Sequence, residues 1–390
     1  MAAQPVQFRW GIISTGKIAE CFVKDLLVDP KTRGVEDVVH KVAAVGSRTV
    51  DKAKEFIATV AGGDETIKSY GSYAEVYADK DVDAVYIGTP HTYHYENALD
   101  AIKAKKNVLC EKPVSCNSAE LRSLIAAAKK NNVFFMEALW TRFHPLALEV
   151  KKVIDEGTLG KPIVVHADLS GNFDIDSTHF RFIYPRKALM IGADIPTTHR
   201  ILDPGLGGGA LLDLGPYPLV WAIIALYEHS ANNHVKPAVS GAMLKTPITG
   251  VDASTAFVLT FSPPSDRSSS LYAQAILSCS ITLNAPDPGV TIRFEKGTIK
   301  IAPPIYCPKQ FTVQYLGGNG KLVREETKVF EYVGVGWHFE ADEVARCIQA
   351  GKLESDLWGH EKSLLEMGIF DELRKQGGYE FPPGVEKVSN

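Results

Sequence analysis

Three side chains in this sequence, far apart along the chain, are of the types that acid–base chemistry requires: Lys112, Asp213 and Tyr217. Lys112 follows an apolar segment in the tripeptide EKP at 111–113, and Asp213 and Tyr217 lie four residues apart at the start of a predicted helix. If that first turn is helical, the two side chains share one face. A free tyrosine has a pKa of about 10 and is a poor base at neutral pH, but a neighbouring ammonium such as Lys112 lowers that pKa and makes proton transfer feasible. On position alone, Lys112 is as compatible with a surface turn as with catalysis, and Asp213 with a helix cap.

A glycine-containing turn links the first predicted strand to the first predicted helix. The segment GIISTGKIA at 11–19 fits the dinucleotide-binding pattern G-x-G-x-x-G/A at Gly16 and Ala19, with Ser14 in place of the first glycine. Backbone N–H groups in such a turn approach a pyrophosphate at the N-terminus of the helix. The alternative is an ordinary glycine turn. The residues expected to contact a dinucleotide here are Ser14, Thr15, Gly16, Lys17 and Ile18.

The residues after the second predicted strand distinguish between two dinucleotides. NAD sites usually place an acidic residue there, whereas an arginine accommodates the 2′-phosphate of NADP. This chain has Ser47 and Arg48 at that place, with Lys52 one helical turn later, while Asp51 lies beyond the diagnostic position. The alternative is a solvated basic loop. The sequence therefore predicts NADP, contacted by Ser47, Arg48 and Lys52.

Strands that alternate with helices are expected to position these turns. The predicted strands lie at 8–14, 41–46, 82–88, 107–110 and 133–136. The predicted helices begin near residue 18 and then span about 51–60, 93–105 and 118–130. Because each parallel connection needs a crossover, this alternation predicts a doubly wound parallel sheet, with the turns at the carboxyl ends of its strands.

The pattern changes after about residue 145, where a second domain is expected to begin. A helix at 146–156 and a strand at 163–169 precede a polar stretch at 172–206, a helix at 217–227 and a run of strands. These strands are predicted at 239–244, 256–261, 272–283, 290–294, 311–315 and 327–332, with SPPSDRSSS at 262–270 as a hairpin loop. Successive strands without intervening helices predict a mostly antiparallel sheet. We therefore expect domains at 1–145 and 146–390, with the final helices at 339–350 and 361–375 able to pack back on the first domain.

Composition and charge narrow the class of protein. The 390 residues are 45% hydrophobic and 23% charged, which is ordinary for a globular chain. A net charge of -4, with no basic stripe, makes nucleic acid an unfavoured partner. The 6 cysteines form no CxxC pair, so neither a disulfide framework nor a zinc site is expected, and no other metal spacing is evident. No long apolar run or signal peptide is visible, so we expect no membrane segment and a cytoplasmic protein.

Four segments together resemble one known family. They are EKP at 111–113, LWTRFHP at 139–145, GGGALLDLGPYP at 207–218 and GWHFEADEVARCIQAGKLES at 336–355. The chain is similar, over nearly its whole length, to the glucose–fructose oxidoreductase/inositol dehydrogenase (Gfo/Idh/MocA) family. Within it, the chain is most similar to the branch of dimeric dihydrodiol dehydrogenases and NADP-dependent D-xylose 1-dehydrogenases. The resemblance implies a Rossmann domain, an α/β domain with an open, mostly antiparallel sheet, and a homodimer formed through that sheet.

The resemblance also implies roles for individual residues. Lys112 matches the family's active-site lysine, and Asp213 and Tyr217 match its acid/base pair. The positions that match those lining the cofactor are Gly16, Ser47, Arg48, Thr89, Pro90, His94 and Glu111, with Lys112 beside them and His91 at the same cleft. Trp140, Arg142 and Phe143 match the segment near nicotinamide and substrate. Substrate contacts are thus expected from Lys112, Trp140, Phe143, Asp213 and Tyr217.

The expected reaction is oxidation of C1 of an aldose, with D-xylose giving D-xylonolactone. Tyr217 would take the proton of the C1 hydroxyl, Lys112 would stabilise the developing negative charge, and Asp213 would orient and polarise the site. Two alternatives remain: a trans-dihydrodiol dehydrogenase acting on aromatic diols, and a non-catalytic NADP sensor. In the polar stretch, His179 and His199 could reach substrate, whereas Arg181, Arg186 and Arg200 are expected in loop or dimer contacts.

Overall fold

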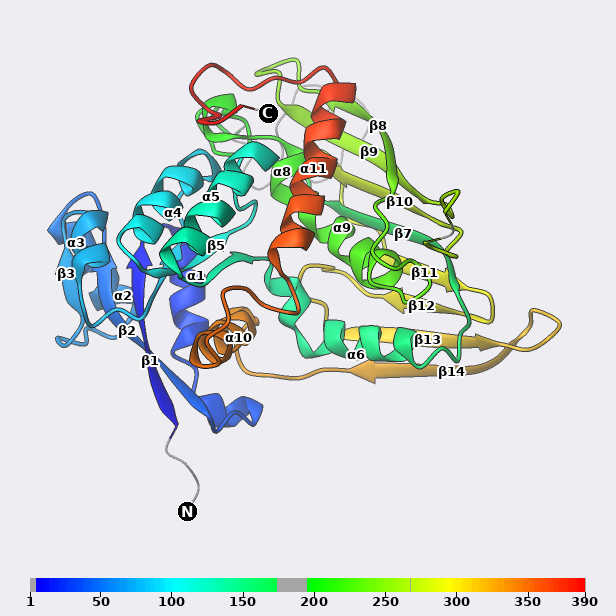
Figure 1. Ribbon diagram of the computed structural model, residues 1–390, viewed down its shortest axis with the longest axis horizontal. Coiled ribbons are helices and arrows are strands. Elements are labelled where there is room, and N and C mark those ends of the chain that lie inside the picture. Colours follow the sequence, from blue (N-terminus) through cyan, green and yellow to red (C-terminus); the bar gives the residue numbers. More distant parts are fainter. Residues whose placement is uncertain (1–4, 174–194, 267, 390) are drawn as a thin grey trace, which may run out of the picture. The chain divides into compact units, whose positions relative to one another are not determined.

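The computed structural model describes residues 5–173, 195–266 and 268–389. The expectations for His179, Arg181 and Arg186 therefore lie outside the described residues. The chain forms two compact units, and each is described by itself (Figure 1). The first unit comprises Met1–Leu148, Phe330–Gly368 and Glu386–Asn390, and the second comprises Glu149–Val329 and Ile369–Val385.

The first unit contains the parallel sheet that the sequence predicted. Its strands lie in the order β3-β2-β1-β4-β5-β6, and every pair is parallel. The strands are β1 (Val6–Ile13), β2 (Val38–Gly46), β3 (Lys68–Tyr70), β4 (Ala84–Ile87), β5 (Asn107–Glu111) and β6 (Phe135–Ala138). This order is that of a dinucleotide-binding Rossmann sheet, whose strand order reverses between β1 and β4. The doubly wound prediction is confirmed.

Helices connect these strands and cover the sheet. They are α1 (Lys17–Leu26), α2 (Val50–Val60), α3 (Tyr73–Ala78), α4 (His94–Lys103), α5 (Ser118–Asn131) and α10 (Trp337–Gln349). Helices α4 and α5 pack side by side, and α1 packs against α10 (Figure 1). The ring of Phe22 on α1 stacks on Tyr86 of β4 with centroids 3.8 Å apart, so aromatic packing joins helix and sheet in the core.

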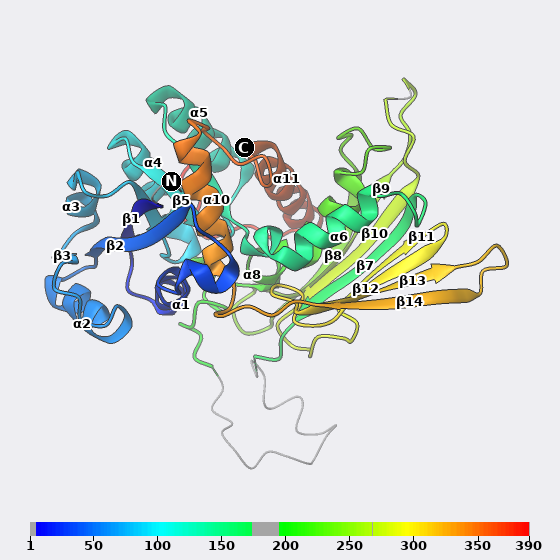
Figure 2. The same ribbon diagram turned by 90° about the horizontal axis from the view of Figure 1, so that it is seen from below.

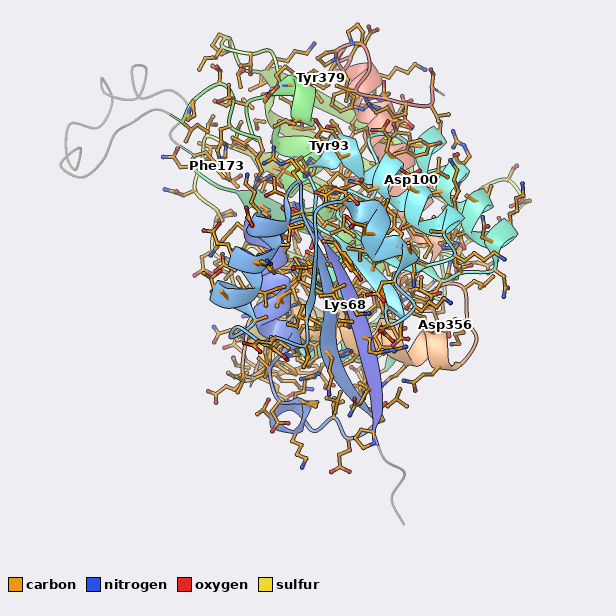
Figure 3. All side chains as sticks on the ribbon, turned by 90° about the vertical axis from the view of Figure 1, so that its left-hand side faces the viewer. Lys68, Tyr93, Asp100, Phe173, Asp356 and Tyr379 are labelled. Atoms are coloured by element: carbon orange, nitrogen blue, oxygen red, sulfur yellow. The ribbon has the colours of Figure 1, made fainter. Side chains whose placement is uncertain are left out.

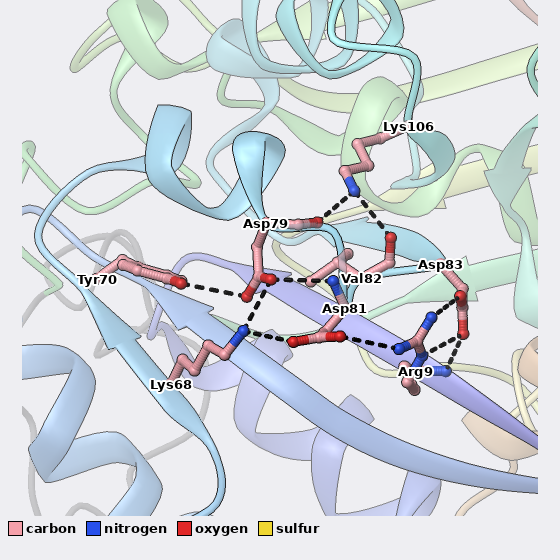
Figure 4. A network of polar contacts seen from close by, with 8 residues as sticks. All are labelled: Arg9, Lys68, Tyr70, Asp79, Asp81, Val82, Asp83 and Lys106. Atoms are coloured by element: carbon pink, nitrogen blue, oxygen red, sulfur yellow. Dashed lines mark hydrogen bonds and ion pairs between the residues drawn. The ribbon is translucent and has the colours of Figure 1, made fainter.

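Ion pairs fix the amino ends of the strands (Figure 4). Lys68 of β3 donates to Asp79 at 2.9 Å and to Asp81 at 2.7 Å, while Arg9 of β1 donates to Asp83 at 2.7 Å. Lys106, ahead of β5, donates to the Asp79 carbonyl oxygen at 2.5 Å. In Figure 3, Lys68 lies toward one end of the strands and the labelled Tyr93, which follows β4, lies toward the other. The charged network therefore anchors the edge opposite the predicted cofactor turns.

The second unit contains an eight-stranded sheet in the order β14-β13-β12-β11-β7-β10-β9-β8 (Figure 2). Its strands are β7 (Pro162–Ser170), β8 (Ala238–Lys245), β9 (Asp252–Phe261), β10 (Ala273–Ser280), β11 (Val290–Phe294), β12 (Gly297–Ile301), β13 (Gln310–Leu316) and β14 (Leu322–Val329). Strands β7 and β10 are parallel and all other neighbouring pairs are antiparallel, so the predicted mostly antiparallel sheet is confirmed. Strands β9 (ending at Phe261) and β10 (beginning at Ala273) are antiparallel neighbours, as the predicted hairpin requires.

One face of this sheet is covered by helices and the other is open within the described chain. Burial alternates along β10, where Ala273, Ala275 and Leu277 are buried while Gln274 and Ile276 are exposed. Two short helices, α8 (Ala210–Leu214) and α9 (Pro216–Ala222), pack on β7, β9 and β10. A π-helical turn, Ile223–Tyr227, follows α9.

The longest apolar helical stretch lies in the interior of the second unit. By length and composition Pro204–Tyr227 could cross a membrane, but 94% of its most apolar window is buried inside the structure. Such burial is typical of a core helix in a folded domain.

The remaining helices are α6 (Pro145–Asp155), at the junction of the two units in the chain, and α11 (His360–Gln376).

Candidate active site

The turn after β1 presents backbone amides at the point where the strand order reverses. Gly16 caps α1, and no side chain caps the helix, so its first N–H groups are available to an anion. Gly16 and Lys17 are exposed, whereas Ser14, Thr15 and Ile18 are half-buried. This arrangement is what pyrophosphate binding requires.

Ser14 occupies the place of the first glycine in an unusual backbone conformation. Its φ is +98°, a region that residues other than glycine rarely adopt. The Ser14 Oγ accepts a hydrogen bond from the Gly16 N–H at 3.2 Å, and the Ser14 N–H donates to the Gly46 carbonyl oxygen at 3.3 Å. The serine therefore makes the same tight turn as a glycine, with a hydroxyl added at the phosphate-facing loop.

Close approach of α1 to the sheet depends on Gly88, the residue after β4. A Cβ atom at this position would lie 3.2 Å from Ile18 Cγ2 and 3.6 Å from Ala19 Cβ. The small residues Gly88 and Ala19 together let the start of α1 lie against the end of β4. The sequence pattern identified Ala19 as the third position of the turn, but it did not show that Gly88 is its partner.

The turn after β2 carries Ser47 and Arg48, which the sequence predicts to discriminate between NAD and NADP. The Thr15 and Ser47 hydroxyls lie 3.1 Å apart, so the turns after β1 and β2 are hydrogen-bonded to each other. Arg48 and Lys52 are exposed beyond the buried Ser47. Burial raises the pKa of Tyr73 on α3, and the positive charge of Arg48 opposes that shift, which places Arg48 near the start of α3. An exposed cation at this edge fits a 2′-phosphate.

The turn after β4 contains four of the predicted cofactor residues. Thr89 is buried, Pro90 is exposed and His91 is half-buried. His94 is fully buried, with Nδ1 2.7 Å from the Pro113 carbonyl oxygen and Nε2 2.7 Å from the Thr89 carbonyl oxygen. Burial lowers the pKa of His94, and the two carbonyl oxygens oppose this. His94 thus links the turns after β4 and β5, and its expected contact with the cofactor stays a prediction.

Lys112 lies at the carboxyl end of β5, within a turn held by buried acids. Glu111 accepts hydrogen bonds from the Tyr86 hydroxyl at 2.6 Å and from the Lys112 backbone N–H at 3.3 Å. The Lys112–Pro113 peptide bond is cis, and the Val114 N–H donates to Glu137 Oε1 at 3.0 Å. Carboxylates from β5 and β6 therefore fix the backbone on both sides of Lys112.

Two further acids are buried behind this turn. Burial raises the pKa of Glu340 on α10 well above its usual range, and the charge of Glu111 adds to the effect. Burial and the neighbouring Glu137 likewise raise the pKa of Glu366 on α11, while the charge of Lys112 opposes that shift. Burial therefore favours the neutral form of both acids.

The predicted nicotinamide segment follows β6 as a short 3-10 helix, Trp140–Phe143. Trp140, Arg142 and Phe143 are each 3% exposed. The indole of Trp140 stacks on Trp337 at the start of α10, with centroids 4.0 Å apart and planes 5° apart. Trp337 was not singled out in the sequence, because its partner lies in a distant segment.

Asp213 and Tyr217 belong to the second unit, whereas Lys112 belongs to the first. Asp213 is near the end of α8 and Tyr217 near the start of α9, with the helical residue Gly215 between the two helices. Because the backbone stays helical, the predicted four-residue spacing places both side chains on one face. They are 5% and 8% exposed, and the Tyr217 ring lies 5.5 Å from that of Tyr306.

Arg200 is a further member of the site that the sequence analysis assigned only to a loop or dimer contact. Its Nη1 lies 3.0 Å from Asp213 Oδ1, and it comes from the loop that precedes α8. The ion pair restrains the orientation of the Asp213 carboxylate. His199, which the sequence left open as a substrate contact, accepts a hydrogen bond from the Ile201 N–H at Nδ1 (3.4 Å) within the same loop, and a contact with substrate stays a prediction.

Among the described residues, no group of three or more His, Cys, Asp or Glu side chains is arranged to hold a metal ion. The donor set of the first unit instead fits a dinucleotide: uncapped helix amides, two linked hydroxyl turns and an exposed arginine. The strand order of the first unit and the turn after β1 define a protein of the nucleotide-binding Rossmann class.

Comparison with known proteins identifies the family. The model of the oxidoreductase family with an NAD-binding Rossmann fold, GFO_IDH_MocA, matches residues 8–139, and that of the GFO/IDH/MocA C-terminal domain matches residues 147–300. The chain belongs to the Gfo/Idh/MocA family of oxidoreductases, which confirms the resemblance in its sequence.

Two curated relatives are similar over nearly the whole chain. The D-xylose 1-dehydrogenase (NADP(+)) of Hypocrea jecorina is 36% identical, covering 98% of this chain and 95% of that protein. The trans-1,2-dihydrobenzene-1,2-diol dehydrogenase of Danio rerio is 33% identical, covering 95% and 97%.

Solved structures share the fold. An aldose-aldose oxidoreductase from Caulobacter crescentus superimposes with a TM-score of 0.73 at 22% identity, covering 96% of this chain and 98% of that one. A 3-ketoreductase from Actinomadura kijaniata gives a TM-score of 0.70 at 22% identity, covering 95% and 98%. At this identity they establish the fold alone.

Proposed function

We propose that this chain is an NADP-dependent dehydrogenase that oxidises C1 of an aldose, converting D-xylose to D-xylonolactone, which water then opens to D-xylonate. The observation that carries the proposal is the 36% identity to a D-xylose 1-dehydrogenase (NADP(+)) over 98% of this chain. The two candidate regions agree with it, because one unit fits a dinucleotide and the other holds an acid/base pair.

NADP is the proposed cofactor because Arg48 is exposed after β2 where an NAD site would place an acid. When bound, NADP⁺ supplies a hydride acceptor at C4 of its nicotinamide. The uncapped start of α1 and the linked Thr15 and Ser47 hydroxyls would hold the phosphates.

The chain's own residues would move the proton. Tyr217 would remove it from the C1 hydroxyl, and the ammonium of Lys112 would stabilise the negative charge that develops. Asp213, held by Arg200 at 3.0 Å, would orient the site.

A second candidate is oxidation of a trans-dihydrodiol. It is favoured by the 33% identity to trans-1,2-dihydrobenzene-1,2-diol dehydrogenase over 95% of the chain. Aromatic side chains at Trp140 and Phe143 would suit an aromatic diol. A non-catalytic sensor is disfavoured because Lys112, Asp213 and Tyr217 are all present.

The test is the initial rate of nicotinamide reduction with NADP⁺ or NAD⁺, each with D-xylose, D-glucose, L-arabinose or a trans-dihydrodiol. We expect the highest kcat/KM with NADP⁺ and D-xylose. Arg48→Gln should raise the KM for NADP⁺ more than that for NAD⁺, while Lys54→Gln, an exposed control on α2, should change neither. Turnover with the diol alone would show that the substrate is a trans-dihydrodiol and not an aldose. NADP⁺ binding without turnover of any substrate would favour the non-catalytic sensor.

We also propose a homodimer that forms through the open face of the eight-stranded sheet. Ile276 is 43% exposed there and pairs with His166 of β7 and Val258 of β9. Light scattering should give twice the chain mass, and Ile276→Arg should shift it toward the monomer. A monomeric wild type would contradict this proposal.

A cytoplasmic location is proposed because all six cysteines, each within the described residues, are free thiols. Cell fractionation tests it, and recovery of the protein from an oxidising compartment would contradict it.

A further inference from the structure

The start of helix α8 is capped by a side chain from a distant strand. Asp252, the first residue of β9, accepts a hydrogen bond from the Leu211 N–H through Oδ2 at 2.7 Å, and the Ala210 N–H also bonds to this carboxylate. These are the first two amides of α8, which would otherwise be unsatisfied in the core. Asp252 thus acts as a helix cap, although it is not adjacent to the helix in sequence.

The backbone before α8 is shaped around this carboxylate. Gly209 has a φ of +114°, and a Cβ atom there would lie 2.0 Å from Asp252 Oδ1. Glycine is therefore required both by the backbone angle and by the space that the carboxylate occupies. The third glycine of the GGGALLD segment exists to admit Asp252.

Asp213 lies in the first turns of the helical stretch that α8 begins. The first amides of a helix have no partner within it, so the group that accepts their hydrogen bonds helps to fix where α8 starts. Asp213 lies two residues after Leu211, and the helical Gly215 joins α8 to the start of α9, which carries Tyr217. A displaced α8 start would rotate both predicted acid/base side chains.

The surroundings of Asp252 make its charge costly. It is 3% exposed, and Oδ2 also accepts a hydrogen bond from the Thr255 hydroxyl at 3.0 Å. Cys279 on β10 lies near it, and burial together with the charge of Asp252 raises the pKa of that thiol well above its usual range. Burial raises the pKa of Asp252 to about 7, although the hydrogen bonds from Leu211, Thr255 and Ala210 oppose the rise.

We propose that Asp252 is a positioning residue for the reaction, which holds Asp213 and Tyr217 in their working orientation by capping α8 from strand β9. The inference rests on the proposed dehydrogenase function. It also predicts that kcat falls on the acid side of neutrality, because protonation removes the charge that attracts the α8 amides.

The experiment compares Asp252→Asn and Thr255→Val with the wild type. Asp252→Asn should lower kcat by about 10- to 100-fold, as expected for a small misplacement of catalytic groups, and leave the KM for NADP⁺ unchanged. Its kcat should lose the inflection near pH 7. Thr255→Val removes one bond to the charged carboxylate, so its inflection should move to higher pH. This milder variant keeps the proposal testable if Asp252→Asn does not fold.

Leu259→Ala is the matched control, since Leu259 is a buried residue further along β9. It should lower the Tm without changing kcat per folded molecule or the pH profile. If Asp252→Asn and Thr255→Val behave in the same way as this control, the cap is merely structural and the proposal is wrong. A wild type that turns over no substrate would instead contradict the proposed function.

Discussion

Two helix starts in this chain are built alike but differ in charge. Helix α10 follows Gly336, with a φ of +130°, and Asp25 of α1 accepts N–H bonds from Val335, Gly336 and Trp337. Helix α8 follows Gly209, with a φ of +114°, and its cap is Asp252 of β9. In both, a buried carboxylate from a distant element accepts amide hydrogen bonds at a helix start that follows a positive-φ glycine.

The difference lies in what surrounds each carboxylate. Burial alone would raise the pKa of Asp25, but His338 and the three amides outweigh it, and the pKa is lowered. Asp252 accepts hydrogen bonds from the backbone amides of Leu211, Ala210 and its own residue and from the Thr255 hydroxyl, but burial prevails, so its pKa rises to about 7. The carboxylate cap at α10 therefore keeps its charge to lower pH than an ordinary aspartate, whereas the cap at α8 titrates near neutrality, next to the predicted acid/base pair.

The largest expected effect comes from removing the group that the α8 cap serves. Tyr217→Phe should lower kcat by about 10²- to 10⁴-fold, because the proton loses its acceptor. Stopped-flow and steady-state reduction of NADP⁺ measure this loss. A decrease of only a few-fold would show that Tyr217 is not the proton acceptor. The α8 cap would then have no catalytic tyrosine to position.

The two glycines offer a sharper comparison. Gly209→Ala would drive a Cβ atom into Asp252 and should reproduce the roughly 10- to 100-fold loss of kcat expected from misplaced catalytic groups. Gly336→Ala would place a Cβ atom 2.3 Å from His144 Cε1, so we expect lower stability instead. Measurements of kcat and Tm on both variants test this difference. Equal losses of kcat in the two variants would contradict it.

The two capping carboxylates, Asp25 and Asp252, should also affect the free energy of unfolding in different pH ranges. The pKa of Asp252 rises from an ordinary 3.8 to about 7, so the folded state binds this proton more tightly. Below the pKa of Asp252 in the unfolded chain, this proton contributes fully to the free energy of unfolding. That contribution, on the order of 2–4 kcal/mol, is lost as the pH rises toward 7. For Asp25, whose pKa is lowered, the contribution is present above 3.8 and is lost as the pH falls below it.

Urea unfolding at several pH values measures both contributions. Asp252→Asn should flatten the slope between pH 4 and 7, and Asp25→Asn should flatten the slope at lower pH. Slopes that stay unchanged in both variants would contradict the assigned charges.

The smallest effect is expected from the structural cap itself. Asp25→Ala leaves three amides at the start of α10 without their acceptor, so the free energy of unfolding should fall by about 2–3 kcal/mol. Asp29→Ala, at the exposed cap of the short 3-10 helix Pro30–Arg33, is the control and should cost less. Equal losses in the two variants would show that the buried cap at Asp25 stabilises the fold no more than the exposed cap at Asp29.

The sequence predicted the parts that depend on local pattern. The alternation of strands and helices, the turns after β1, β2 and β5, and the Asp213–Tyr217 spacing all follow from periodicity and short motifs. Strands β3 and β12, of 3 and 5 residues, and helix α3 were missed because such short segments carry little periodicity. The strand predicted at 327–332 lies earlier, at Leu322–Val329, because its pairing with β13 sets its bounds.

What the sequence did not predict depends on contacts between distant segments. Asp252, Arg200 and Trp337 act through partners that lie elsewhere along the chain, on α8 and after β6. Each is an ordinary residue in its own segment, so no local signal marks it. Gly209 belongs to a motif that the sequence analysis identified. Only the folded chain shows why glycine is needed there, because the Asp252 carboxylate lies beside it.

The most direct test of the account is to follow the hydrogen that leaves the substrate. With D-xylose carrying deuterium at C1, the enzyme should produce reduced NADP with one deuterium per lactone formed, as measured by mass spectrometry. Retention of the deuterium in the sugar, or reduced NADP without it, would contradict C1 oxidation by hydride transfer.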